Sequence, residues 1–267
     1  MVTHNWGNLF LHLVAAIVAD ALGFSTFDIV AEALRKGRVR SLRHDLRRKG
    51  TLHKTYWVCA FSINQHAGIC GGFGQPPPKE GPEYQMWEHS TRDTVTCETY
   101  PLCDCQEPKY FSCSPVECEM NKFDDFIRYM CKSSASFAQV IAVDSEFELF
   151  SRAWCVAECV EADSASMPQL VKVLSLQVLD THYRKLTDLA VQKCEATQKE
   201  DKERILAKIP DLEAFNERLQ WLIFGSDGLM NKWMDAQGRI AQAGHIVLRI
   251  QEKEELLMAE SRGAPSA

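Results

Sequence analysis

The chain has 267 residues and a mass of 30.3 kDa, with 46% hydrophobic and 25% charged side chains. This balance is that of an ordinary globular protein, and it excludes a fibrous or wholly disordered chain. The 36 acidic side chains outnumber the 30 basic ones, so the net charge of −6 provides no global positive field. We therefore expect no nucleic-acid partner.

Residues 1–54 are predicted to form a basic helical segment. Apolar residues recur at helical spacing from Leu9 to Ala21, and Gly23 follows as a stop. The apolar run is too short to span a bilayer and lacks the basic start of a secretory signal, so we expect a cytoplasmic protein without a membrane span. Residues 35–49 are strongly basic, which is typical of a solvated helix face or of a surface for an anionic partner.

Residues 55–180 are predicted to form an α/β domain. Three apolar runs have the character of strands buried on both faces: Tyr56–Ile63, Phe137–Val143 and Leu170–Leu176. Helical patterns over Met120–Met130 and Ala153–Val160 lie between them. Strands that alternate with helices in this way predict an open parallel sheet, which we expect to have four to five strands.

Residues 181–267 are predicted to form a helical C-terminal region. An apolar helical face extends from Ile205 to Ile223, Gly225 stops it, and a last helix is expected over Ile240–Leu257. The fold class is therefore α/β, with helical extensions at both ends of the sheet domain.

A cysteine-rich insertion at about residues 70–118 interrupts the α/β domain. Its thiols belong to Cys97, Cys103, Cys105, Cys113 and Cys118. Thiolates in a polar loop can hold a tetrahedral zinc ion that stabilises the loop. Free thiols and a disulfide or redox role are the alternatives. A zinc-stabilised regulatory protein is thus one functional hypothesis.

The most informative stretch joins a predicted buried strand to the helix after it. The strand ends at Val143-Asp144, and the run Ser151-Arg152-Ala153-Trp154-Cys155-Val156-Ala157-Glu158 opens the helix. Ligands of open α/β sheets bind where strands end and helices begin. Trp154 and Glu158 are four residues apart, so they share one helix face, where an indole beside a carboxylate can hold a flat heterocycle. A core tryptophan beside a surface glutamate is the simpler interpretation of the same spacing.

This stretch resembles the start of the third helix in Toll/interleukin-receptor (TIR) domains, above all those of plants, and Phe137–Asp144 resembles the strand before it. Tyr56–Gln65 is similar to the opening strand of that family, Asn121–Ile127 to its second helix, and Leu170–Leu176 to its fourth strand. The resemblance implies a TIR/flavodoxin-like fold over residues 55–180.

Two functions follow from this resemblance. Some TIR domains cleave the bond between nicotinamide and ribose in NAD, which implies that Glu158 is catalytic and that Trp154, Ser62, Asn64 and Asp144 lie around the NAD substrate. Others are non-catalytic modules that self-associate or bind further TIR-like domains in intracellular signalling or defence. His66 follows the first predicted strand, and we assign it to a loop at the same crevice rather than to catalysis.

Overall fold

We describe a computed structural model of the chain. The residues that it describes are 1–68, 76–93, 96–108, 110, 116–117, 123–134, 136–187, 189–196, 199–226, 228–231 and 234–235. The predicted last helix, Ile240–Leu257, lies outside these residues.

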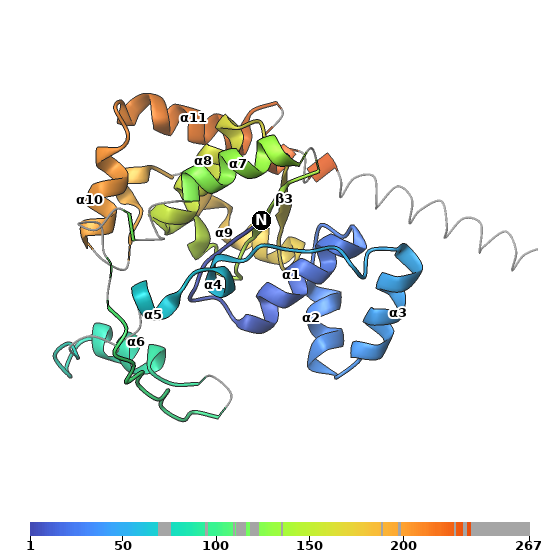
Figure 1. Cartoon of the computed structure of the whole chain (residues 1–267), viewed down its shortest axis with the longest axis horizontal. Helices are drawn as coiled ribbons and strands as arrows, with labels where there is room; N and C mark the ends of the chain where they lie inside the picture. The colour runs from blue at the N-terminus through green and yellow to red at the C-terminus, as the bar shows by residue number, and fades with distance from the viewer. Residues whose placement is uncertain are drawn as a thin grey trace, which may run out of the picture.

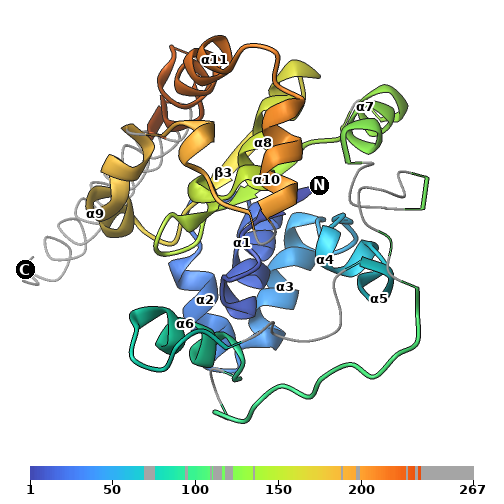
Figure 2. The ribbon, with the colours of Figure 1, turned by 90° about the vertical axis from the view of Figure 1, so that its left-hand side faces the viewer.

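Helices surround a small sheet (Figures 1 and 2). In the N-terminal half, the elements are β1 (Val2–His4), α1 (Phe10–Leu22), α2 (Asp28–Arg35), α3 (Val39–Lys49), α4 (Cys59–Ser62), α5 (Gln65–Gly68) and α6 (Pro82–Ser90). They are followed by α7 (Phe123–Ser133), β2 (Gln139–Ala142), the 3-10 helix η2 (Glu148–Ser151), α8 (Ala153–Ser164), β3 (Gln169–Lys172) and α9 (Leu176–Thr187). The C-terminal elements are the 3-10 helix η3 (Val191–Lys193), α10 (Lys199–Ala207) and α11 (Leu212–Phe224).

The three strands form a parallel sheet in the order β1-β2-β3. Val2 pairs with Val140, and Val140 pairs with Leu170 across the sheet. Each edge is extended by one isolated parallel bridge, from Val58 to Val2 and from Thr26 to Val173. The α/β class and the open parallel sheet are confirmed, whereas a sheet of four to five strands is not, because the bridges at Val58 and Thr26 are single pairs.

Side chains alternate across the sheet and build two separate cores. Val2, Val140 and Ala142 face α1 and α2, and their core includes Phe27 from the start of α2. The opposite face includes Ile141, which packs with side chains of α8 and α11. This alternation follows from the two-residue period of a strand. Residues 1–54 therefore supply both an edge strand of the sheet and the helices that cover one of its faces.

Two glycines end N-terminal helices, and Gly23 does so where the sequence predicts a stop. Gly23 and Gly50 have φ angles of 74° and 76°, which lie in the left-handed region that favours glycine after a helix. The predicted helices over Met120–Met130 and Ala153–Val160 are also confirmed, as α7 and α8.

The prediction of a strand over Tyr56–Ile63 is wrong. Only Val58 of this run pairs with β1, and the chain then turns into the short helix α4. The aromatic residues that suggested burial on both faces have other roles: Trp57 stacks on Phe126 of α7, and Phe61 is 67% exposed. The first strand of the sheet is β1 instead.

A buried ion cluster joins α1 to the sheet. The Asp20 carboxylate accepts hydrogen bonds from Lys54 Nζ and the Tyr56 hydroxyl, both at 2.7 Å, and lies 3.2 Å from Lys172 Nζ. Burial alone would raise the pKa of Asp20, but these donors bring that pKa below its ordinary value. Asp20 is therefore a fully paired structural carboxylate.

No helix in the described part of the chain combines the length and apolar character that a bilayer-spanning segment requires.

Candidate functional site

The segment that leaves β1 contains an unusual group of buried polar atoms. His4 Nδ1, Asn8 Nδ2 and His12 Nδ1 are buried without a hydrogen-bond partner among the described residues. Burial lowers the pKa of both His4 and His12, which favours their neutral forms. Buried polar atoms are nearly always paired, so such a group marks a place where water or a ligand supplies the partners.

Glu158 lies on the sheet side of α8, near the start of this segment but on the opposite face of the sheet from the His4 side chain. Its carboxylate oxygen Oε2 accepts a 2.6 Å hydrogen bond from the hydroxyl of Thr3, which directly precedes His4 in β1. Burial raises the pKa of Glu158 to about 7, despite the opposing effect of the Thr3 hydrogen bond. The side chain is nevertheless only half-buried, so solvent or a ligand can reach part of it.

A chain of hydrogen bonds holds Glu158 against the sheet. Gln169 Nε2 donates to Gln139 Oε1 at 2.7 Å, and Gln139 Nε2 donates to Thr3 Oγ1 at the same distance. Thr3 then donates to Glu158. Because Gln139 and Thr3 each accept one bond of the chain and donate the next, the bonds polarise one another and fix the carboxyl position.

The surroundings of Glu158 are rich in sulfur and aromatic groups. Burial, and the nearby Glu158 carboxyl, raise the pKa of the Cys59 thiol to about 11. Trp6 Nε1 donates to Cys59 Sγ at 3.4 Å, which joins the segment after β1 to α4. Trp154, by contrast, is half-buried against the core that α8 covers. The structure therefore brings Trp6, rather than Trp154, next to the thiol that neighbours Glu158.

The remaining predicted NAD-binding residues mainly contact the backbone. The Ser62 hydroxyl donates to the Val58 carbonyl, and Asn64 Oδ1 accepts from the His66 amide. Asp144 is buried, and its two carboxylate oxygens accept backbone N–H groups from residues 146, 148 and 149 at 2.8–3.1 Å. Asp144 thus shapes the loop after β2, as a capping carboxylate does.

A cavity of about 640 Å³ opens at the carboxyl end of β3, between α2 and the start of α9. His12 and Ser175 line it together with the charged side chains of Asp28, Glu32, Arg35 and Arg38. Glu158 is not among its lining residues. His12 is among the residues that line this cavity, while Glu158 lies on the α8 side of the sheet.

The predicted zinc ligands separate into two groups. Cys103 and Cys105 lie with His66 in a group whose ligand atoms are all within 4.8 Å of one another, and Cys97 does not belong to it. Cys113 and Cys118 lie outside the described residues. The eight cysteines in the described ranges form no disulfide with one another.

No family model matches the chain, and searches of curated proteins and of solved structures found no similar protein.

The sequence suggested Glu158 as a candidate but not its hydrogen-bond partner Thr3, which lies in a segment that was not expected to form a strand. A signal existed at His12, which interrupts the apolar run of α1, and buried histidines rarely lack a partner.

Proposed function

We propose that the chain is a TIR-like protein of the cytoplasm that hydrolyses NAD and releases nicotinamide, with Glu158 as the catalytic carboxylate. The observation that supports this most strongly is the position of Glu158. Its carboxyl is hydrogen-bonded to Thr3 of β1, and burial raises its pKa to about 7. A TIR/flavodoxin-like sheet of four to five strands belongs to the same proposal, and the single bridges at Val58 and Thr26 support it.

A carboxylate suits this reaction because of the charge that develops. When the bond between the ribose C1′ and the nicotinamide nitrogen breaks, its electron pair leaves with nicotinamide, which becomes neutral. The ribose becomes a cationic, oxocarbenium-like species, and a fixed negative charge stabilises it. Water then adds at C1′ and loses a proton, which yields ADP-ribose.

Thr3 and the aromatic side chains have supporting roles in this proposal. The hydroxyl of Thr3 holds the carboxyl in one orientation, so little reorganisation is needed during the reaction. Trp6 is 44% exposed and is joined to Cys59 next to Glu158, so its ring is available to stack on a flat heterocycle.

Nicotinamide release by the purified full-length chain tests the proposal. Wild type should turn over NAD, and Glu158→Gln should reduce the rate by roughly 10²–10³-fold because the charge is lost while the size is kept. The rate of wild type should rise with pH through about 7, where the carboxyl ionises.

Glu161→Gln is the matched control for this assay. Glu161 lies on the same helix and forms an ion pair with Arg128 at 2.7 Å, away from Thr3. Its substitution should leave turnover unchanged. Equal turnover by wild type and Glu158→Gln would show that the site assignment is wrong.

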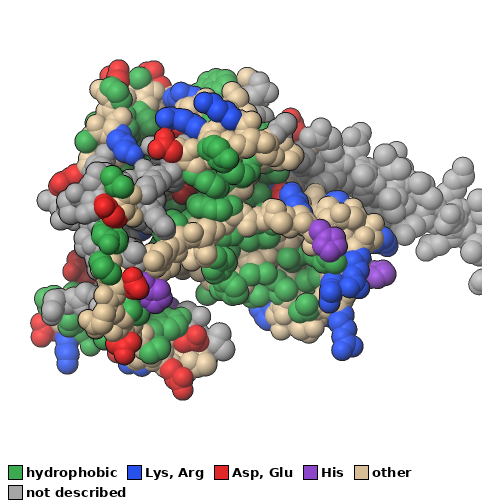
Figure 3. Space-filling model, viewed as in Figure 1, with side chains coloured by type: hydrophobic (Ala, Val, Ile, Leu, Met, Phe, Trp, Pro, Cys, Tyr) green, Lys and Arg blue, Asp and Glu red, His purple; other side chains and the backbone are tan. Residues whose placement is uncertain are grey.

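A second candidate function is a non-catalytic module that self-associates. The observation in its favour is a group of exposed aromatic residues, in which Phe10 and Phe61 are 65% and 67% exposed and pack edge to face at 6.1 Å. Hydrophobic side chains also gather across the middle of this face, over α1 and α4 (Figure 3). If concentrated wild type releases no nicotinamide but forms oligomers that Phe61→Ser disrupts, this function replaces the catalytic one.

A further inference from the structure

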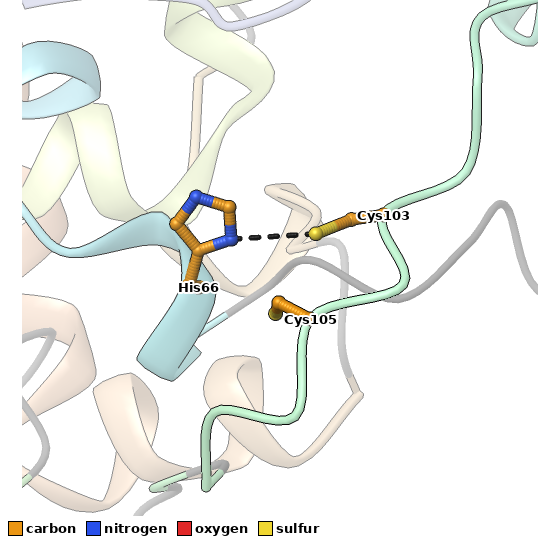
Figure 4. A group of neighbouring side chains, drawn as sticks. All are labelled: His66, Cys103 and Cys105. Atoms are coloured by element: carbon orange, nitrogen blue, oxygen red, sulfur yellow. Dashed lines mark hydrogen bonds between the residues drawn. The ribbon is translucent and has the colours of Figure 1, made fainter.

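His66, Cys103 and Cys105 converge from two parts of the chain that are far apart in sequence. His66 lies on α5, and the two cysteines lie on the extended run after α6 (Figure 4). His66 Nδ1 is 3.3 Å from Cys103 Sγ, and the three ligand atoms are all within 4.8 Å of one another.

Local geometry explains why both cysteines point the same way. In extended backbone, side chains two residues apart lie on one face, so a Cys-x-Cys spacing presents two thiols together. Figure 4 shows both thiols on the side of the chain that faces the imidazole. The His66 amide is also held by Asn64 Oδ1 at 3.1 Å, which fixes the start of α5.

We propose that His66, Cys103 and Cys105 bind a zinc ion. With Zn–S of about 2.3 Å and Zn–N of about 2.0–2.1 Å, ligand atoms of a tetrahedral site are about 3.4–3.8 Å apart. The observed spacing is close to this, so the ligands need only small shifts. Two thiolates and a neutral imidazole are soft and borderline donors that favour zinc over magnesium or calcium.

The charge and the ligand number both fit this ion. Two thiolates balance the double positive charge of zinc, so the centre is neutral and needs no further negatively charged ligand. Three protein ligands leave one of the four tetrahedral positions for water or another donor. Of the thiols expected from sequence, Cys103 and Cys105 belong to this site and Cys97 does not, and His66 was not expected as a ligand.

Zinc at this place would close a long loop. His66 and Cys103 are 37 residues apart, and α6 lies between them. Metal binding would remove much of the conformational freedom of that segment in the way that a cross-link does. The site would therefore position the insertion relative to α5, independently of any activity at Glu158.

The metal content of the full-length chain, expressed with zinc and purified under reducing conditions without chelator, tests the site. Wild type should carry about one zinc per chain, and Cys103→Ser and Cys105→Ser should each retain less than about a tenth. Cys97→Ser is the matched control, since Cys97 belongs to the same insertion but not to the cluster. It should keep its zinc.

A second measurement keeps the proposal testable if the cysteine variants fail to fold. Cobalt added to metal-free wild type should give a thiolate charge-transfer absorption and the intense visible bands of a tetrahedral ion. His66→Ala should weaken both, and His66→Cys, which restores a ligand, should recover them. Wild type without zinc and without cobalt absorption, or equal zinc loss in Cys97→Ser, would overturn the proposal. Neither result bears on nicotinamide release, so the two proposals fail separately.

Discussion

Asp20 and Glu158 are two carboxylates that lie between a helix and the sheet on opposite faces. Asp20 on α1 contacts two lysines and a tyrosine hydroxyl, and its pKa is lowered by them. Glu158 on α8 has one hydrogen bond, from Thr3, and no ion-pair partner within the described residues. Burial raises its pKa to about 7.

This difference separates a structural from a functional role. A buried charge that is fully paired holds elements together, and its removal harms the fold. When burial raises the pKa of a carboxyl to near 7, its ionised form lowers the stability of the fold. Such a carboxyl is suited to proton transfer and charge stabilisation at physiological pH. The ion pairs of Asp20 therefore explain how α1 docks on the sheet. The raised pKa of Glu158 instead supports a role in a candidate catalytic site.

The largest effect should come from Asp20→Asn. The substitution leaves Lys172 buried without its charged partner, since the Lys172 side chain is only 8% exposed. The free energy of unfolding should fall by about 3–5 kcal/mol, as measured by urea denaturation at pH 7. Asp45→Asn is the control, because the Asp45–Arg48 pair is long, at 4.0 Å, and exposed. Its effect should stay within about 0.5 kcal/mol. A loss below about 1 kcal/mol in Asp20→Asn would contradict a structural role.

Glu158→Gln should raise the free energy of unfolding, whereas Asp20→Asn lowers it. The folded-state pKa of about 7 exceeds the ordinary value of 4.5, so protonation of Glu158 favours the folded state. This contribution is fully present below pH 4.5 and is lost as the pH rises through 7. The variant should thus be more stable than wild type at pH 8 by on the order of 2 kcal/mol.

The comparison of unfolding curves at two pH values checks this. The stability difference between Glu158→Gln and wild type should shrink to near zero at pH 4, where the glutamate of wild type is protonated and therefore neutral like the glutamine. A variant that is less stable than wild type at pH 8 would indicate that the ionised carboxylate contributes to the fold.

Much of the helical architecture was predictable from the sequence, because glycines and apolar periodicity mark it directly. Gly23 ends α1 as expected. The strand β1 was missed because Val2–His4 is three residues long and contains two polar side chains. Tyr56–Ile63 was misassigned because aromatic residues resemble a buried strand even when they stack on other elements or face solvent.

The candidate site was predictable only in part. Glu158 follows from a local pattern, since its helix and the strand before it are continuous in sequence. Thr3 and Gln139 are brought to it by strand pairing over 136 residues or more, and spacing within one segment contains no such information. His66 and Cys103 are likewise 37 residues apart, so the spacing within one segment could not predict that they meet.

Titration of the two carboxyls in one sample tests the central claim most directly. The side-chain carboxyl carbons of Asp and Glu would be labelled with ¹³C, and the Glu158 signal would be assigned by its loss in Glu158→Gln. We expect a midpoint near pH 7 for Glu158 and a midpoint below 3.8 for Asp20. A Glu158 midpoint near 4.5, the value of an ordinary glutamate, would contradict it.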